Sequence, residues 1–304
     1  MRVKSVSVWG VVWLAVGAWG AAALGVNPVR GEGGEAVGAD WVGWHELGEL
    51  VVRQPADWYS VRGEGGPSTA DVEAIERSLE LGAGALRAYF DDPALEAALR
   101  AASVEVIVHA EPGPRANEVT ATTRTGTRDG TAATYFAEIH LLAPSSYGPG
   151  LLTSVGEPKD GEYFARLSVH ELSTVPLDLA TRIKPEGWRF RQAPAWFVQG
   201  YQEYLGMMCP ATEAGRAALE RRVAIVAAEP GRVDDSFGLD VRGPYVTGSV
   251  LLLFMHERYG RERVRGILTS AEPTFGGAVR ASLGVGLGEF MRDFEAWIGA
   301  RAGS

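Results

Sequence analysis

Two adjacent residues, His170 and Glu171, have the types and the setting that could do chemistry, within the segment VHELST. On a helix, two histidines four residues apart share one face and can bind zinc. A glutamate directly after the first histidine can then act as general base on the metal-bound water. The first half of that pattern is present, but Thr174 stands four residues after His170. The segment therefore has the first histidine and the glutamate of a hydrolytic zinc site, but it lacks the second histidine ligand.

A second segment with polar and aromatic residues, APAWFVQGYQEYLG, follows at 193–206. Pro194 suits the first turn of a helix, so we expect a helix over 195–205. On it, Glu203 lies one turn from Gln199. Four aromatic residues recur at helical spacing, which favours core packing over substrate binding: Trp196, Phe197, Tyr201 and Tyr204.

The elements upstream should provide a helix and a small sheet. Residues 68–90 have helical apolar spacing and a cap at Ser68 or Thr69, and 95–102 predicts a short second helix. Three stretches predict strands by alternation or β-branched content: 104–109, 117–125 and 133–143. Residues 49–62 predict a strand pair or a strand and a turn. His109 and His140 are interpreted as structural or surface residues.

The helix that carries His170 should begin after Asp160, which can cap it. We expect it to end near Thr174, because Pro176 lacks a backbone donor and clashes with the carbonyl of Leu172, at a cost of about 3 kcal/mol. The rest of the chain should be helical, with His256 and Glu257 on a solvated face. The expected helices are 211–229, 245–259, 261–270, 275–283 and 287–300.

These motifs together resemble the gluzincins, or peptidase MA-like superfamily, whose signature is H-E-x-x-H followed by P-x-W-x-x-E-G-x-A-x-Y. The resemblance covers roughly residues 70–300 and is carried by His170, Glu171, Pro194, Trp196, Gly200 and Tyr204. The segment HERYG at 256–260 also fits, because a helix that ends in Tyr-Gly often follows in this family. It implies an α+β, zincin-like fold. In such a fold a small mixed sheet with an N-terminal helix packs on a mainly helical C-terminal part.

The resemblance places the first zinc ligand at His170 and the general base at Glu171. The second ligand position falls on Thr174 and the third on Gln199, so two of the three ligands are substituted. A neutral hydroxyl and a neutral amide carbonyl are poor substitutes for imidazole and carboxylate on Zn²⁺. Without the metal, water keeps its unperturbed pKa, far above neutral pH, and Glu171 alone cannot activate it for amide hydrolysis.

Three further residues are candidates for the cleft that the resemblance implies: Asp178, Glu203 and Tyr245. The preferred interpretation is an exported, peptidase-like protein without activity or cofactor, which binds a peptide or protein in the retained cleft. One alternative is an active zinc metallopeptidase, with Asp178 or Glu203 among atypical ligands. Another alternative is a structural cell-envelope protein.

The composition and the N-terminal segment limit the partners and the location that we expect for this protein. The net charge is −9, without a basic cluster, which argues against a nucleic-acid partner. Arg2 and Lys4 precede an apolar run, which predicts a signal peptide over 1–24 or, if uncleaved, a membrane anchor. A flexible linker at 25–40, an α/β part at 41–160 and a helical part at 161–304 should follow. The expected location is periplasmic, cell-envelope or extracellular.

Overall fold

The computed structural model describes residues 58–302, apart from 112–120, 129–130, 148–149, 154–155, 185 and 229–242. The expected signal peptide, the linker and most of the stretch 49–62 lie outside the described residues. The described part is an α+β fold with a small mixed sheet, as the sequence predicts. One buried hydrophobic core joins the sheet to the C-terminal helices.

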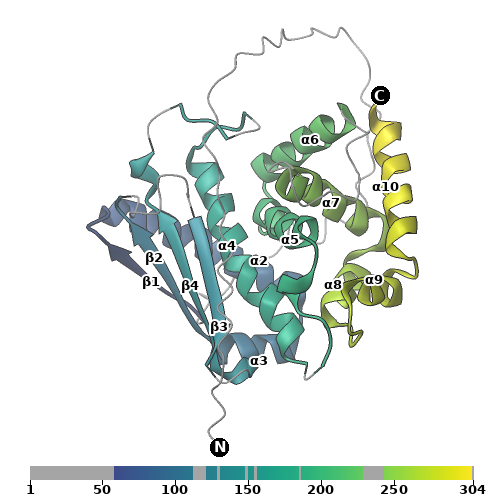
Figure 1. The fold of residues 1–304 in the computed structure, drawn as a ribbon. Helices are drawn as coiled ribbons and strands as arrows, with labels where there is room; N and C mark the ends of the chain where they lie inside the picture. Colours follow the sequence, from purple (N-terminus) through teal and green to yellow (C-terminus); the bar gives the residue numbers. More distant parts are fainter. Residues whose placement is uncertain are drawn as a thin grey trace, which may run out of the picture.

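Four strands form the sheet in the order β1-β2-β4-β3 (Figure 1). The strands β1 (Ser60–Glu64), β2 (Ser103–His109) and β4 (Tyr135–Leu142) run parallel, whereas the edge strand β3 (Ala121–Thr127) is antiparallel to β4. Ile139 of β4 pairs with Val106 on one side and with Thr123 on the other. Because paired residues share a face, Thr123 points toward the same side as the buried Val106 and Ile139.

Two long helices build the layer next to the sheet. α4 (Gly161–Arg182) packs on β3 and β4, and α2 (Thr69–Phe90) packs beside α4. Both predicted caps are confirmed, since Ser68 and Asp160 accept hydrogen bonds from the first turns of α2 and α4. At Gly82 of α2 a Cβ would lie 2.3 Å from a methyl group of Val169 on α4, so a glycine is needed for this close approach. The predicted short helix follows as α3 (Pro93–Ala101).

α4 continues through Pro176, so the expected end near Thr174 is wrong. The proline removes one backbone donor, at a cost of about 3 kcal/mol in a helix interior. The turn after it is fixed by burial, because Leu177 and Leu179 are fully buried and each such side chain contributes about 1.5–3 kcal/mol. Packing therefore outweighs the proline, and Asp178 stays on the same helix as the His-Glu pair.

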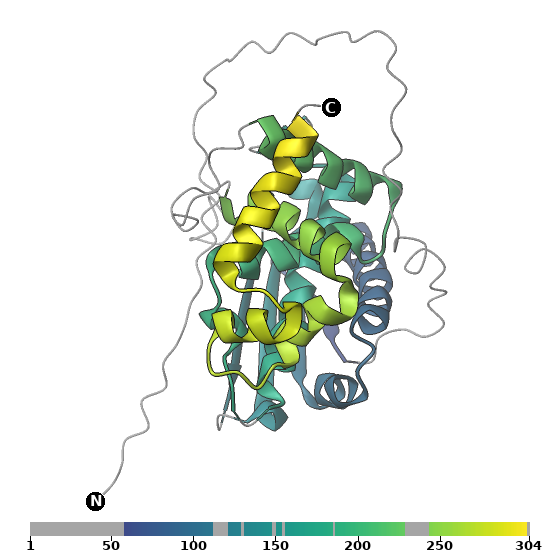
Figure 2. The same ribbon diagram turned by 90° about the vertical axis from the view of Figure 1, so that its right-hand side faces the viewer.

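The expected C-terminal helices are confirmed, and they stack on the side of α4 away from the sheet (Figure 2). They are α5 (Ala195–Met208), α6 (Glu213–Ala228), α7 (Gly248–Tyr259), α8 (Arg261–Thr269), α9 (Phe275–Leu283) and α10 (Leu287–Ala302), with a π-helical turn at Gly243–Thr247. Among the described residues, 3₁₀ turns lie at Ala132–Thr134, Pro144–Ser146 and Phe190–Gln192. In the part of the chain that is described, no helix is long and apolar enough to cross a bilayer.

His256 of α7 does not lie on a solvated face, contrary to expectation. Its Nε2 lies 2.9 Å from the Tyr89 hydroxyl, and its Nδ1 lies 2.7 Å from the Leu252 carbonyl oxygen. Burial lowers the pKa of His256 to about 4, although the hydrogen bond to Leu252 acts in the opposite direction. This histidine is therefore a neutral packing residue between α2 and α7. Its neighbour Glu257 is exposed, as predicted.

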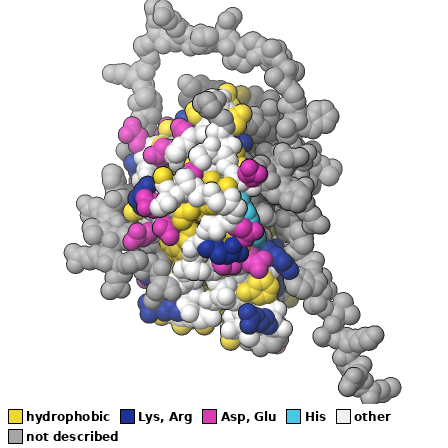
Figure 3. Space-filling view, turned by 90° about the vertical axis from the view of Figure 1, so that its left-hand side faces the viewer, with side chains coloured by type: hydrophobic (Ala, Val, Ile, Leu, Met, Phe, Trp, Pro, Cys, Tyr) yellow, Lys and Arg dark blue, Asp and Glu magenta, His cyan; other side chains and the backbone are white. Residues whose placement is uncertain are grey.

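The face of the sheet opposite α4 carries interspersed charges (Figure 3). Its ion pairs join neighbouring strands: Arg62 with Glu105, and Arg124 with Glu138. His109 and His140 also lie here, with Nε2 and Nδ1 2.8 Å apart and their rings stacked. The two histidines thus contact each other across neighbouring strands, an arrangement that fits structural or surface residues.

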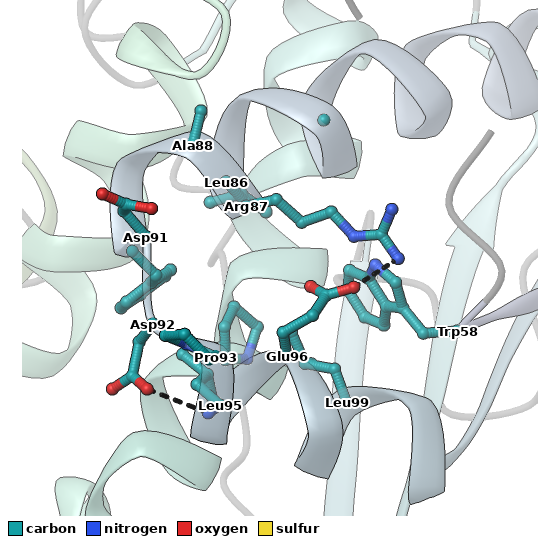
Figure 4. A pocket seen from close by; sticks show the side chains of 13 residues that line it. Trp58, Leu86, Arg87, Ala88, Asp91, Asp92, Pro93, Leu95, Glu96 and Leu99 are labelled. Atoms are coloured by element: carbon teal, nitrogen blue, oxygen red, sulfur yellow. Dashed lines mark hydrogen bonds and ion pairs between the residues drawn. The ribbon is translucent and has the colours of Figure 1, made fainter. Parts of the chain in front are cut away.

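A cavity of about 610 Å³ lies where α2, α3 and α4 meet. Its lining is mostly apolar and includes Trp58, Leu95, Leu99 and the helix-interior Pro176. The ion pair between Arg87 and Glu96, 2.9 Å long, crosses one side of it (Figure 4). None of the residues mapped to the zinc signature lines this cavity.

Candidate functional site

His170 and Glu171 lie in the buried middle of α4, with 3% and 2% of their surfaces exposed. Glu171 Oε2 accepts a short hydrogen bond from the hydroxyl of Thr123 on β3. Its other oxygen, Oε1, lies 4.0 Å from Nε2 of His170. The edge strand therefore holds the carboxylate that would have to act as general base.

A chain of alternating charges extends from His170 away from the sheet. Its Nδ1 lies 3.2 Å from Glu203 Oε1 on α5, and Glu203 Oε2 lies 2.5 Å from Nη1 of Arg222 on α6. Arg222 Nε is in turn 3.7 Å from Glu157 Oε1, and Glu157 Oε2 is 3.3 Å from Nη2 of Arg166. Three helices and the loop before α4 thus meet in one ionic cluster: His170, Glu203, Arg222, Glu157 and Arg166.

Burial and neighbouring charges act in opposite directions on this cluster. Burial alone would lower the pKa of His170, but the contact with Glu203 and the nearby Glu171 raise it above the usual value. Burial alone would raise the pKa of Glu203, whereas Arg222 and His170 hold it well below the usual range. Burial raises the pKa of Glu171, and His170 and Thr123 offset this only in part. The geometry therefore favours a protonated His170 beside an ionised Glu203.

The two substituted ligand positions differ in their hydrogen bonding: Thr174 has a side-chain partner, whereas the Gln199 carbonyl oxygen has none among the described residues. The Thr174 hydroxyl accepts a short hydrogen bond from the side-chain amide of Gln202. Gln199 is 8% exposed, and its carbonyl oxygen is buried without a hydrogen-bond partner among the described residues. Thr174 therefore lies where α4 packs against α5. Among the described residues, no hydrogen bond joins His170 to Thr174 or to Gln199.

Of the remaining candidates, Tyr245 lies at this site and Asp178 lies away from it. The ring of Tyr245 stacks over the ring of His170, with centroids 6.4 Å apart. Asp178 is fully buried at the sheet instead, where it accepts hydrogen bonds from Thr125 at 3.0 Å and from Tyr135 at 3.3 Å. It also pairs with Arg182 at 2.9 Å. Asp178 is therefore a structural link between α4 and the sheet.

This donor set does not fit a zinc ion. One imidazole is present, but its neighbouring carboxylate on Glu203 is neutralised by Arg222, and the Thr174 hydroxyl is committed to Gln202. Zinc in proteins prefers imidazole, thiolate and carboxylate, arranged tetrahedrally. Within the described ranges, no group of three or more His, Cys, Asp or Glu side chains has an arrangement that could hold a metal.

Sequence reasoning missed Thr123, Glu157 and Arg222. A signal for Arg222 exists, because it lies three residues after Leu219 and four before Val226, on the apolar face of α6. An arginine at such a position requires a buried partner. The identity of that partner depends on contacts between distant segments, which spacing does not reveal.

Of the mapped motif residues on α4, His170 and Thr174 thus contact side chains of α5, whereas Glu171 contacts Thr123 of β3. Neither a family model nor a curated protein nor a solved structure matches the chain.

Proposed function

We propose that this chain is an exported protein with a gluzincin-like scaffold that does not hydrolyse peptides and instead binds an extended peptide. One observation carries the proposal: side chains of the chain itself pair with His170 and Thr174, at two positions of the zinc signature. Glu203 pairs with His170 and Arg222, and Gln202 donates to Thr174. Contacts within the chain therefore engage the side chains that a zinc ion would need at these two positions.

The state of Glu171 supports the loss of hydrolysis. A general base must be ionised and must reach the water that it deprotonates. Burial raises the pKa of Glu171, and the Thr123 hydroxyl occupies one of its oxygens. In the absence of a bound metal the attacking water would also keep its unperturbed pKa, which lies far above neutral pH. Glu171 is therefore a poor general base, and the water that it would have to deprotonate is a poor nucleophile.

The edge strand β3 supports peptide binding. Among the described strands it pairs only with β4, so its other edge has backbone groups that no described strand pairs. Thr123 and Thr125 fasten its inner face to Glu171 and Asp178 on α4. A rigid edge strand can accept an extended peptide as an additional strand through main-chain hydrogen bonds. The expected ligand class is therefore an extended peptide, with affinity from its backbone.

Fluorescence anisotropy with a labelled tryptic digest of casein tests this proposal. We expect saturable binding without cleavage. A bound sequence is then synthesised twice, with backbone N-methyl groups on alternate residues in the two possible registers. Because strand addition uses the N–H groups of every second residue, one methylated peptide should lose most of its affinity and the other should keep it. Cleavage of the peptides, or no binding up to millimolar peptide, would refute the proposal.

A further inference from the structure

The cavity between α2, α3 and α4 lies apart from the site described above and has the size of a ligand pocket. Its volume of about 610 Å³ falls within the range of roughly 300–1,000 Å³ that is usual for small-molecule pockets. Protein interiors contain few voids larger than a water molecule, so a space of this size among packed helices is a candidate binding site. Two of the lining residues, Asp91 and Pro93, are exposed, which places the opening at the turn between α2 and α3.

The inner wall of the cavity is apolar. Leu86 of α2 and Leu95 and Leu99 of α3 are buried and line it from opposite sides (Figure 4). A ligand that occupies the cavity would exchange contact with water for contact with these side chains. Burial of apolar surface is favourable, so the wall selects for a ligand that is itself largely apolar.

The charged groups around the cavity are already paired or lie at its opening. Glu96 contacts two arginines, Arg87 at 2.9 Å and Arg100 at 3.0 Å. Asp92 caps α3 through two backbone N–H groups, and Asp91 is exposed at the opening. An anionic ligand would therefore meet arginines that are committed to Glu96, and a cationic ligand would meet a carboxylate that is already neutralised. Because burial of an unpaired charge is strongly unfavourable, these contacts favour a neutral ligand.

Trp58 adds a hydrogen-bond donor to this lining. Its side chain is 3% exposed, and its Nε1 is buried without a hydrogen-bond partner among the described residues. In Figure 4 the indole extends toward the ion pair of Arg87 and Glu96 at one side of the cavity. A buried donor without a partner is unfavourable, and a ligand atom that accepts from it would remove that penalty. An indole N–H can only donate, so the matching group on the ligand is an acceptor such as a carbonyl oxygen.

We propose that the cavity binds a neutral, largely apolar small molecule whose carbonyl oxygen accepts a hydrogen bond from Nε1 of Trp58. An aryl ketone has this chemistry, with apolar rings for the buried wall and one acceptor for the indole. None of the lining residues belongs to β3, so this site and the proposed peptide site can exist independently of each other.

Photolabelling of the purified full chain with benzophenone tests the proposal. On irradiation the ketone adds to a C–H bond that its carbonyl group touches, and peptide mass spectrometry locates the adduct. We expect labelling on lining residues such as Trp58, Leu95 and Leu99, half-maximal on the order of 100 µM, as ligands of this size reach. Diphenylmethane, which has the same two rings and no carbonyl group, should suppress the labelling. Labelling that is spread over the surface, or that does not saturate, would overturn the proposal.

Trp58→Phe separates the hydrogen bond from the apolar contacts. The Kd of diphenylmethane divided by that of benzophenone should fall about three- to tenfold in this variant, because only the ketone loses a hydrogen bond. Trp297→Phe is the matched control and should leave the ratio unchanged, since the Trp297 indole donates to Glu257 and does not line the cavity. An unchanged ratio in a folded Trp58→Phe chain would show that Trp58 is not the donor and would contradict the proposal.

Leu99→Trp should fill the cavity and abolish the labelling of its lining. Leu81→Trp makes the same change at a position of α2 that is 53% exposed and outside the lining, so it should label as the wild type does. Full labelling of a folded Leu99→Trp chain would overturn the proposal. If Leu99→Trp does not fold, the competition with diphenylmethane in the wild type decides, and a failure to compete would overturn the proposal. Neither result bears on peptide binding, which the anisotropy experiment tests separately.

Discussion

Gly200, one of the residues that carry the resemblance, offers a sharp test of how α5 is positioned. A Cβ added at this residue would lie 2.3 Å from the carbonyl carbon of Gly248 and 2.5 Å from its carbonyl oxygen. Both contacts are with backbone, so no side chain can rotate away. An ordinary contact begins near 3.4 Å. We therefore expect Gly200→Ala to force α5 and α7 apart by about 1 Å.

The free-energy change follows from two opposing effects. Overpacking against a fixed backbone costs about 3 kcal/mol, whereas alanine gains about 1 kcal/mol over glycine in a helix. Gly200→Ala should therefore lower the free energy of unfolding by about 2 kcal/mol. Urea denaturation followed by circular dichroism measures this, provided that the slope m is unchanged.

Gly299 in α10 is the matched control, because no atom lies within 4 Å of the Cβ that Gly299→Ala would add. That substitution should raise stability by up to about 1 kcal/mol through helix propensity alone. The two alanine variants should thus differ in sign. Equal stability of Gly200→Ala and the wild type would refute the close crossing of α5 and α7 and the placement of the α5 site residues that depends on it.

Three further predictions concern buried polar groups. Because Glu203 helps to raise the pKa of His170, the wild type should lose stability as pH rises above about 6.5 through the folded pKa, and Glu203→Gln should flatten this slope in urea titrations at pH 6 and 9. Asp178→Asn should lower the free energy of unfolding by about 3 kcal/mol, since it breaks a buried charge pair, and a change below 1 kcal/mol would contradict that role. Burial raises the pKa of the Cys209 thiol to about 12, so thiol reagents should label it only after unfolding.

Local patterns predicted most of the fold because they reflect strong, short-range preferences. The helix from Thr69 has a capping residue and a clear apolar period, and the alternation around Ile139 fits a strand with one buried face. The failure at Pro176 has a tertiary cause. The burial that holds α4 together beyond the proline comes from segments far away in the sequence, and a local rule for proline cannot include it.

The sequence indicated which residues to inspect at the site, but it did not indicate which side chains pair with one another. Spacing placed Glu203 one turn from Gln199, but only the fold shows that Glu203 faces His170 and Arg222. Asp178 shares a helix with His170 and nevertheless turns to the sheet, because Thr125 and Arg182 satisfy its carboxylate there. Pairings of this kind depend on how helices and strands pack, which a single sequence does not state.

The central claim is that the His-Glu site of this chain does not hold a catalytic zinc. The most direct measurement is the metal content of the purified wild-type chain, expressed in zinc-supplemented medium and analysed by inductively coupled plasma mass spectrometry. The account predicts far less than one zinc per chain, together with no peptide cleavage. About one zinc per chain, removed by a chelator with loss of peptide cleavage, would contradict it.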